Sequence, residues 1–186
     1  MKYLKSIVLV LLLLMTSCSQ KKETGDQPVH VQITVKDYGT VDLELYPDIA
    51  PLTVENFVKL AESGFYDGNC FHRIIDGFMI QGGADLNGTV KHIKGEFRSN
   101  GYENDLKHTE GVISMARAKD PDSATSQFFI MVGDAPWLDG QYAAFGKVTE
   151  GLEIIKKIAS DARPIDDNGS IAQEDRPIIE SVRILD

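Results

Sequence analysis

The hydrophobic positions of the chain first show a two-residue period. Residues 31–35 and 41–45 each alternate apolar with polar side chains, and Asp37-Tyr38-Gly39 lies between them. Successive side chains of a β-strand point to opposite faces, so each segment presents one apolar face. Asp and Gly favour tight turns. The pattern therefore predicts a β-hairpin over residues 29–45 with one buried face.

Two segments have the spacing of amphipathic helices. Pro51 suits the first turn of a helix, and Gly64 ends the apolar spacing that follows it. The apolar positions of this first helix are Val54, Phe57, Val58 and Ala61. Those of a second helix are Leu152, Ile155, Ile158 and Ala159. Both sets recur at the three- and four-residue intervals of a helix with one buried face.

The remaining ordered segments are predicted to be short strands. They are residues 112–117, 127–132, 143–148 and 178–184. Residues 88–102 contain glycine and lysine without a clear period and are predicted to be a loop. The chain has no internal repeat. Many short strands with two helices favour a mainly β fold, a closed antiparallel barrel with capped ends.

The stretch 71–83, FHRIIDGFMIQGG, predicts two short strands joined by a tight turn at Asp76-Gly77. Two registers are open to it. A two-residue loop would pair Ile75 with Phe78. A three-residue loop with Gly77 in the left-handed conformation pairs Ile75 with Met79 instead.

The second register is preferred because it sets Arg73 opposite Gln81. A guanidinium then lies beside an amide that can hold it, with Phe78 and Met79 close by. One cationic donor would project over an apolar floor. Such a site contains no general acid, no general base and no metal.

Three blocks of sequence carry a resemblance to a known family. They are FHRIIDGFMIQGG from Phe71, SQFF from Ser126 and WLDG from Trp137. Their order and spacing resemble those of the cyclophilin family of peptidyl-prolyl cis-trans isomerases, or rotamases, over residues 29–186. The resemblance implies a closed, eight-stranded antiparallel barrel capped by two α-helices. It also implies a monomer that needs no cofactor and acts on proline-containing polypeptides.

The same resemblance assigns candidate roles to residues. Arg73 matches the catalytic arginine of the family, and Gln81 matches the glutamine that supports it. The proline pocket is implied to consist of Phe78, Met79, Phe129 and Leu138. Contacts to the substrate backbone are implied for Ala116 and Gln127. Trp137 matches the residue that borders the pocket and contacts cyclosporin, so cyclosporin-like ligands are candidate partners.

Two positions depart from the best-known family members. Tyr142 stands where these carry histidine, and Arg117 stands where they carry asparagine. Tyr142 can still offer an aromatic wall and a hydroxyl group, so it is retained as a candidate substrate-binding residue. Arg117 adds a long cation at the groove. Substrate preference beyond proline therefore does not follow from the resemblance.

The chemistry expected of such a site follows from the Xaa-Pro amide. Rotation is slow because the nitrogen shares its lone pair with the carbonyl, which gives a barrier of about 18–20 kcal/mol. In the twisted transition state this sharing is lost and the nitrogen becomes more basic. A donor aimed near the nitrogen, with an apolar pocket that fixes the ring, therefore favours rotation.

Composition and charge limit the other partners. The chain has 186 residues, 42% of them hydrophobic, which suits one domain with a sizeable core. Its formal net charge of -9 makes nucleic acid an unfavourable partner.

The N-terminal segment predicts export and an anchor. Lys2 and Lys5 precede an apolar run over residues 7–15, which is too short to span a bilayer. Met-Thr-Ser-Cys18 resembles the lipobox of bacterial lipoproteins, with Met15 in place of the usual Leu. We therefore expect a signal peptide at residues 1–17, an acylated Cys18 and a polar tether over residues 18–28.

This interpretation places the domain of residues 29–186 in the bacterial cell envelope, anchored to a membrane by lipid and facing outside the cytoplasm. An ordinary signal peptide with a cysteine nearby is the alternative. Cys70 is the only other cysteine, so lipidation of Cys18 would leave no partner for a disulfide. Cys70 lies in an apolar stretch and is predicted to behave as a small buried hydrophobe.

The histidines and the acidic loop do not have the spacing of other kinds of site. Strand alternation puts His72 on the face opposite Arg73, as a packed residue and not a base. His30, His92 and His108 lack metal-site spacing. The sequence 166–169, DDNG, resembles part of a calcium loop. An EF-hand frame through Gly169 would begin at Pro164 and end at Asp175, and these residues do not fit the first and last ligand positions.

Two functions of different class remain. One is an isomerase that assists the folding of secreted or envelope proteins. The other is a non-catalytic chaperone or scaffold of cyclophilin fold that binds proline-containing segments. Arg73, Gln81 and Phe129 favour the isomerase, because a pure binder needs no donor aimed at the prolyl nitrogen.

Overall fold

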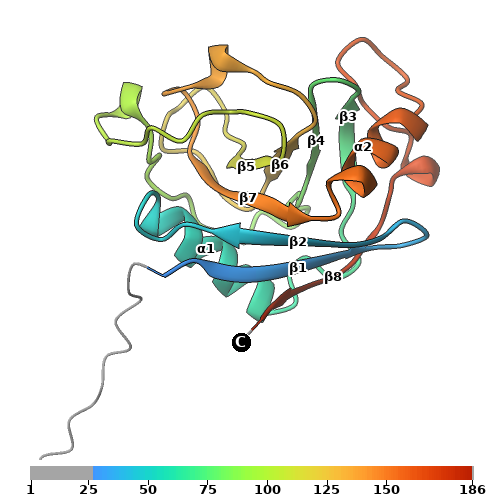
Figure 1. Cartoon of the computed structure of the whole chain (residues 1–186), viewed down its shortest axis with the longest axis horizontal. Helices are drawn as coiled ribbons and strands as arrows, with labels where there is room; N and C mark the ends of the chain where they lie inside the picture. Colours follow the sequence, from blue (N-terminus) through green and yellow to red (C-terminus); the bar gives the residue numbers. More distant parts are fainter. Residues whose placement is uncertain (1–26, 186) are drawn as a thin grey trace, which may run out of the picture.

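The computed structural model describes residues 27–185, which form eight strands and two α-helices (Figure 1). In chain order these are β1 (Val29–Val35), β2 (Gly39–Leu45), α1 (Pro51–Glu62), β3 (Phe71–Ile75), β4 (Met79–Gly82), β5 (Val112–Met115), β6 (Phe128–Met131), β7 (Ala144–Glu150), α2 (Leu152–Asp161) and β8 (Ile179–Ile184). The predicted signal peptide, Cys18 and most of the tether lie outside the described residues. None of the helices within residues 27–185 is long and apolar enough to cross a membrane.

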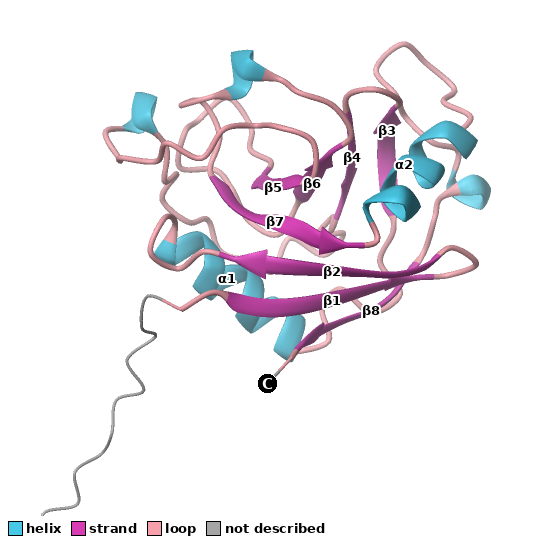
Figure 2. Cartoon of the chain, in the orientation of Figure 1, coloured by secondary structure: helices cyan, strands magenta, loops and turns pink. Residues whose placement is uncertain are grey.

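The strands form one antiparallel sheet in the order β3-β4-β6-β5-β7-β2-β1-β8. The sheet curls around the core (Figure 2). Helix α1 packs against β8, and α2 packs against β2 and β4, so the two helices cover different parts of the curled sheet. The mainly β architecture with two helices is thus as predicted.

The predicted closed barrel was wrong, because the two ends of the sheet do not join as a ladder. Strands β3 and β8 meet only near a single isolated bridge between Cys70 and Ile178. Farther along, the edge of β3 is occupied by the loop between α2 and β8, which lies beside it in Figure 1. The backbone N–H of Ile74 donates to the Gly169 carbonyl, and the N–H of Ile171 donates to the His72 carbonyl. The sheet is therefore an open, curled half-barrel with an edge satisfied by a loop.

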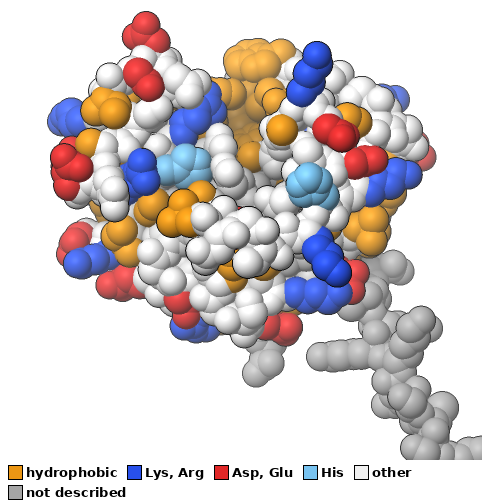
Figure 3. All heavy atoms as spheres, turned by 180° about the vertical axis from the view of Figure 1, so that it is seen from behind, with side chains coloured by type: hydrophobic (Ala, Val, Ile, Leu, Met, Phe, Trp, Pro, Cys, Tyr) orange, Lys and Arg blue, Asp and Glu red, His pale blue; other side chains and the backbone are white. Residues whose placement is uncertain are grey.

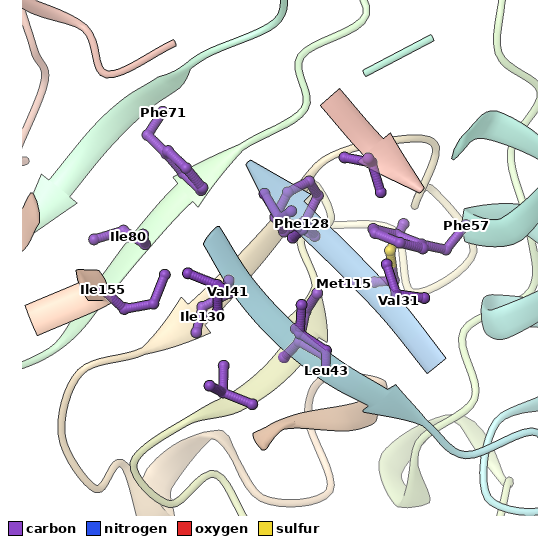
Figure 4. Packing of buried hydrophobic residues seen from close by; sticks show 14 of the residues in the cluster. Val31, Val41, Leu43, Phe57, Phe71, Ile80, Met115, Phe128, Ile130 and Ile155 are labelled. Atoms are coloured by element: carbon purple, nitrogen blue, oxygen red, sulfur yellow. The ribbon is translucent and has the colours of Figure 1, made fainter. Parts of the chain in front are cut away.

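The core is built from the inward faces that the alternation predicts. Val31, Ile33 and Val35 of β1 face Val41, Leu43 and Leu45 of β2, and all six are buried. Helix α1 contributes Phe57, which packs on the rings of Tyr66, Phe128 and Phe145 at centroid distances of 5.0, 5.4 and 5.5 Å. Figure 4 shows Phe57 and Phe128 among the buried side chains of the core. Complete burial of such a ring contributes about 1.5–3 kcal/mol. This cluster fixes α1 against β6 and β7.

A buried carboxylate caps the start of α1 from a distant part of the chain. The helix has no side-chain cap at Ala50 and no acid in its first turn. Instead Glu96 accepts hydrogen bonds from the backbone N–H of Leu52 at 3.0 Å and of Thr53 at 2.8 Å. It also accepts one from the Thr53 hydroxyl at 2.7 Å. Glu96 thus satisfies helix donors that otherwise lack partners, and its charge complements the helix dipole.

Candidate active site

The site is built on the β3–β4 hairpin, whose register is the preferred one. Ile75 pairs with Met79, and Arg73 pairs with Gln81. Gly77 has a φ of 71°, the left-handed conformation that the three-residue loop requires. The predicted register is confirmed, and it places the guanidinium and the amide side by side on neighbouring strands.

The Arg73 guanidinium is held at two of its nitrogens. Nη1 donates to Gln81 Oε1 at 3.2 Å and lies 3.7 Å from Met79 Sδ, while Nε donates to the backbone carbonyl of Asn168 at 2.8 Å. Gln81 is held in turn, because its Nε2 donates to Gln127 Oε1 at 2.9 Å. Within residues 27–185, Nη2 of Arg73 donates to no side chain or carbonyl, so its two hydrogens stay available to a ligand.

The loop that holds Nε of Arg73 contains the DDNG sequence, whose spacing does not fit a calcium loop. Gly169 has a φ of 84°, and a Cβ atom there would lie 2.6 Å from the Ile74 carbonyl oxygen and 2.5 Å from Ile75 Cγ1. The Asp166 carboxylate accepts the N–H of Ser170 at 2.9 Å and closes the loop. The DDNG turn signal was visible in the sequence, but its contact with β3 was not. Asn168 therefore positions Arg73 through its backbone.

His72 does not lie opposite Arg73, and that prediction was wrong. The register of β3 shifts between Phe71 and Arg73, and both Phe71 and Ile74 are buried in the main core. His72 and Arg73 therefore both lie on the outer side of a β-bulge. Burial of the ring lowers the pKa of His72 most, and the positive charge of Arg176 lowers it further. Gln127 and Arg73 also lie close to the ring. His72 borders the site as a neutral imidazole.

Strand β6 divides its side chains between the core and the site. Phe128 and Ile130 belong to the main core cluster, as predicted, whereas Phe129 and Met131 belong to a second cluster on the other face. Phe129 is only 5% exposed and forms the floor of a pocket.

The pocket has a volume of about 360 Å³, which suits a small ring with its flanking backbone. It is lined by Arg73, Phe78, Met79, Gln81, Ala116, Arg117, Phe129, Leu138 and Tyr142. Seen from behind, the surface has a hollow with hydrophobic side chains inside and basic side chains beside it (Figure 3). An apolar floor beside a fixed cation is the arrangement that the sequence predicts.

The structure brings eight of the ten candidate catalytic and substrate-binding residues to this pocket, and the other two lie next to it. Gln127 contacts the pocket through its hydrogen bond with Gln81. Trp137 is 66% exposed, and its ring centroid lies 6.0 Å from that of Phe78 at the margin. Tyr142 stands edge-on to Phe129 at 5.8 Å and forms a wall.

A buried polar group behind the pocket floor was missed from the sequence. The His108 ring stacks on Phe129 at a centroid distance of 6.0 Å. Its Nδ1 lies 3.1 Å from Asp139 Oδ1, and its Nε2 lies 3.0 Å from the Ser114 hydroxyl. Burial lowers the pKa of His108, so the ring is neutral at neutral pH. The three residues fix the Phe129 ring from behind, and no local sequence signal links them.

Comparison with known proteins identifies the family. Residues 30–186 match the family model described as cyclophilin type peptidyl-prolyl cis-trans isomerase/CLD. The chain belongs to the cyclophilin family of peptidyl-prolyl cis-trans isomerases. The activity class follows from this membership, so the chain is an isomerase.

Cyclophilins of distant organisms are similar to this chain. Peptidyl-prolyl cis-trans isomerase A of Dickeya dadantii is 45% identical over 135 residues, which cover 70% of each chain. Peptidyl-prolyl cis-trans isomerase B of Bacillus subtilis is 42% identical over 146 residues, covering 76% of this chain and 93% of the relative.

A solved cyclophilin shares the fold. The crystal structure of a cyclophilin type peptidyl-prolyl cis-trans isomerase of Cryptosporidium parvum superposes with a TM-score of 0.72 at 31% identity, covering 86% of this chain and 98% of the other. A second structure of that protein, obtained in the presence of the dipeptide Ala-Pro, gives a TM-score of 0.71. Cyclophilins bind proline-containing peptides, and the pocket of this chain has the dimensions for such a ring.

Proposed function

We propose that Arg73 catalyses rotation about Xaa-Pro bonds bound in this pocket. The observation that carries the proposal is the guanidinium held by Gln81 and Asn168 beside an apolar pocket of about 360 Å³. Because both holding contacts are hydrogen bonds to neutral oxygens, the cation keeps its charge available to the substrate. The Cryptosporidium structure obtained with Ala-Pro supports a dipeptide of this kind as ligand.

The mechanism requires one half of the amide to be fixed while the other half turns. Phe78, Phe129 and Leu138 would grip the proline ring through apolar contact. A free hydrogen on Nη2 of Arg73 would then point toward the prolyl nitrogen as its lone pair localises. The contact strengthens only in the twisted state. It therefore stabilises the transition state more than the bound ground state, and the barrier falls.

The magnitude required is modest. Lowering the barrier by about 6 kcal/mol accelerates rotation roughly 10⁴-fold. A preorganised donor supplies about 2.7–4 kcal/mol, and positioning of the ring can supply the remainder. Exchange NMR on an Ala-Pro peptide tests the proposal, since it detects interconversion directly. A folded protein that leaves the uncatalysed exchange rate unchanged would refute it.

We further propose that the isomerase works outside the cytoplasm, on secreted or envelope proteins, while anchored to a bacterial membrane through Cys18. The support comes from the charged start, the short apolar run and the lipobox-like Met15-Thr16-Ser17-Cys18. Strand β1 begins at Val29, so the polar tether would span at most about 40 Å. The pocket would then stay close to the membrane surface.

The anchor predicts a specific chemical form of the mature protein. Mass spectrometry of material purified from its native host should find residues 1–17 missing and Cys18 acylated. Two or more chains are expected, because one chain gives only marginal membrane binding at about 0.8 kcal/mol per buried CH₂. A Cys18→Ser variant should leave the membrane fraction. Full-length soluble protein with unmodified Cys18 would contradict the prediction.

We propose in addition that cyclosporin-like ligands compete with substrate for the groove. The exposed Trp137 beside Phe78 offers an apolar margin, and the pocket retains Met79 and Phe129. A titration followed by Trp137 fluorescence should saturate, and isomerisation should fall in parallel. The affinity should be weaker than in family members that carry asparagine in place of Arg117 and histidine in place of Tyr142. An absence of competition at high ligand concentration would show that the groove differs from this interpretation.

A further inference from the structure

Arg117 occupies an unusual position at the edge of the pocket. Its Cζ lies 4.6 Å from the centroid of the Tyr142 ring and 5.0 Å from that of Phe97. Nε and Nη2 both donate to the Gln141 carbonyl, at 3.0 and 2.8 Å, and Nη1 donates to the Ala118 carbonyl at 3.0 Å. The guanidinium plane is therefore fixed in place by backbone oxygens and aromatic rings.

The charge of this fixed guanidinium is not neutralised. All of its acceptors are carbonyl oxygens, and across residues 27–185 no carboxylate lies within the 4.0 Å of an ion pair with it. Other cations of the chain do have such partners, for example Arg183 with Asp67 and Arg98 with Asp105. Arg117 thus keeps a full positive charge at the groove.

The charged side chains that line the pocket are likewise positive. Both Arg73 and Arg117 line it, and no aspartate or glutamate of the described residues 27–185 does. This local charge is opposite to the net charge of -9 of the chain. A carboxylate on a bound segment would find two unpaired cations, whereas a lysine would be repelled by both.

We propose that Arg117 is a specificity-determining residue that selects substrates with an acidic side chain within two residues of the proline. The inference rests on the proposed function, since it concerns the same groove. Arg73 is committed to the prolyl amide, so a flanking carboxylate pairs with Arg117. The contact lies at an exposed margin, and the expected preference is therefore moderate, about two- to fivefold in kcat/KM for Glu over Gln at the responsive position.

Arg117 also supports the Tyr142 wall, and the test must separate this contact from selection by charge. Arg117→Gln removes both the charge and the planar stack on the Tyr142 ring. Arg117→Lys keeps the charge and loses the stack. Charge selection predicts that the lysine variant retains the Glu preference and the glutamine variant loses it. Support of Tyr142 alone predicts that both variants slow all peptides alike.

The experiment uses peptides in which Glu, Gln or Lys is placed in turn at the two positions before and the two positions after proline. Exchange NMR gives kcat/KM for the wild-type chain, for both Arg117 variants and for Lys147→Gln. Lys147 is exposed on β7 and is not a pocket residue, so its variant controls for a change in net charge. Circular dichroism confirms that each variant is folded.

The wild-type chain and the Lys147→Gln control should prefer Glu over Gln, and Gln over Lys, at one or more positions. Arg117→Gln should reduce the Glu-to-Lys ratio toward that set by Arg73 alone. High salt should reduce the wild-type ratio in the same direction. An unchanged ratio in Arg117→Gln, or a ratio lost equally in Arg117→Lys, would overturn the inference.

Failure of the proposed function would look different. In that case no peptide would exchange faster with the wild-type chain, whatever its charge. The same peptides titrated by NMR would still report binding, and the dissociation constants of the Glu and Lys peptides would test Arg117 without turnover. Equal affinities for both in the wild-type chain would then reject selection by charge.

Discussion

Arg73→Ala is expected to keep its fold and to lose about 10²–10³ in kcat/KM, the usual cost of removing one preorganised donor from an active site. The substitution leaves the pocket floor intact, since Phe129 is held by the His108 stack and not by the arginine. It removes the pocket cation that Gln81 orients. Ring binding should therefore survive while rotation slows.

The conservative variant distinguishes a directed donor from a simple charge. Arg73→Lys should recover little activity, because Asn168 and Gln81 hold two different nitrogens of a planar guanidinium, and the single nitrogen of lysine cannot reproduce that fork. His72→Gln should keep most of the activity, since no proton is transferred in the proposed mechanism. Exchange NMR measures the rates, and circular dichroism confirms the fold. A folded Arg73→Ala variant with nearly wild-type rate would overturn the mechanism.

The rate should also be flat between about pH 6 and 8, because arginine stays protonated there. Burial lowers the pKa of both His72 and His108, so in the folded protein each holds its proton less readily than a free histidine does. Below the unfolded histidine pKa of about 6.5, the unfolded state binds more protons than the folded state, and stability falls as pH falls. Any loss of activity on acidification should therefore follow unfolding. A titration of the rate without unfolding, abolished in His72→Gln, would implicate a base.

Glu96→Ala is expected to cost about 3 kcal/mol of unfolding free energy, which corresponds to roughly a 10²-fold change in the unfolding equilibrium. The substitution leaves the backbone N–H of Thr53 and the Thr53 hydroxyl without their buried acceptor, and frees the N–H of Leu52. It also removes the negative charge at the start of α1. Because Phe57 of this helix packs in the main core, the loss should be felt by the whole domain.

Glu96→Gln provides the matched comparison, since it keeps one acceptor oxygen and should lose roughly half as much. Glu62→Gln is the control: Glu62 is exposed at the other end of α1 and should change stability by less than about 0.5 kcal/mol. Urea unfolding followed by circular dichroism gives the three values. Equal stability of the Glu96→Ala and Glu62→Gln variants would show that the buried cap does not stabilise α1.

The sequence alone determined the features that depend on neighbouring residues. Two-residue alternation located the β1–β2 hairpin, and three- to four-residue spacing located both helices to within a few residues. The Asp76-Gly77 turn located the second hairpin and left two registers open, and the preferred one, with Arg73 opposite Gln81, is the one observed. Each of these rests on local backbone preference or periodicity, which a single stretch of sequence contains.

The resemblance of three sequence blocks to the cyclophilin family went further and implied which distant side chains share a site. Residues from β3, β4, β6 and the segment around Leu138 do meet at one pocket, and the family is the one that the three blocks resemble.

Only the tertiary structure decided the remaining features, because each depends on contacts between segments far apart in the chain. The Gly169 loop occupies the edge of β3, which keeps the barrel open and gives Arg73 a second acceptor. A bulge moves His72 to the side of Arg73, against simple alternation. Glu96 caps the start of α1 by accepting the N–H of Thr53, which lies 43 residues earlier in the chain. Such partners are selected by the global packing that satisfies buried polar groups, and no local pattern encodes them.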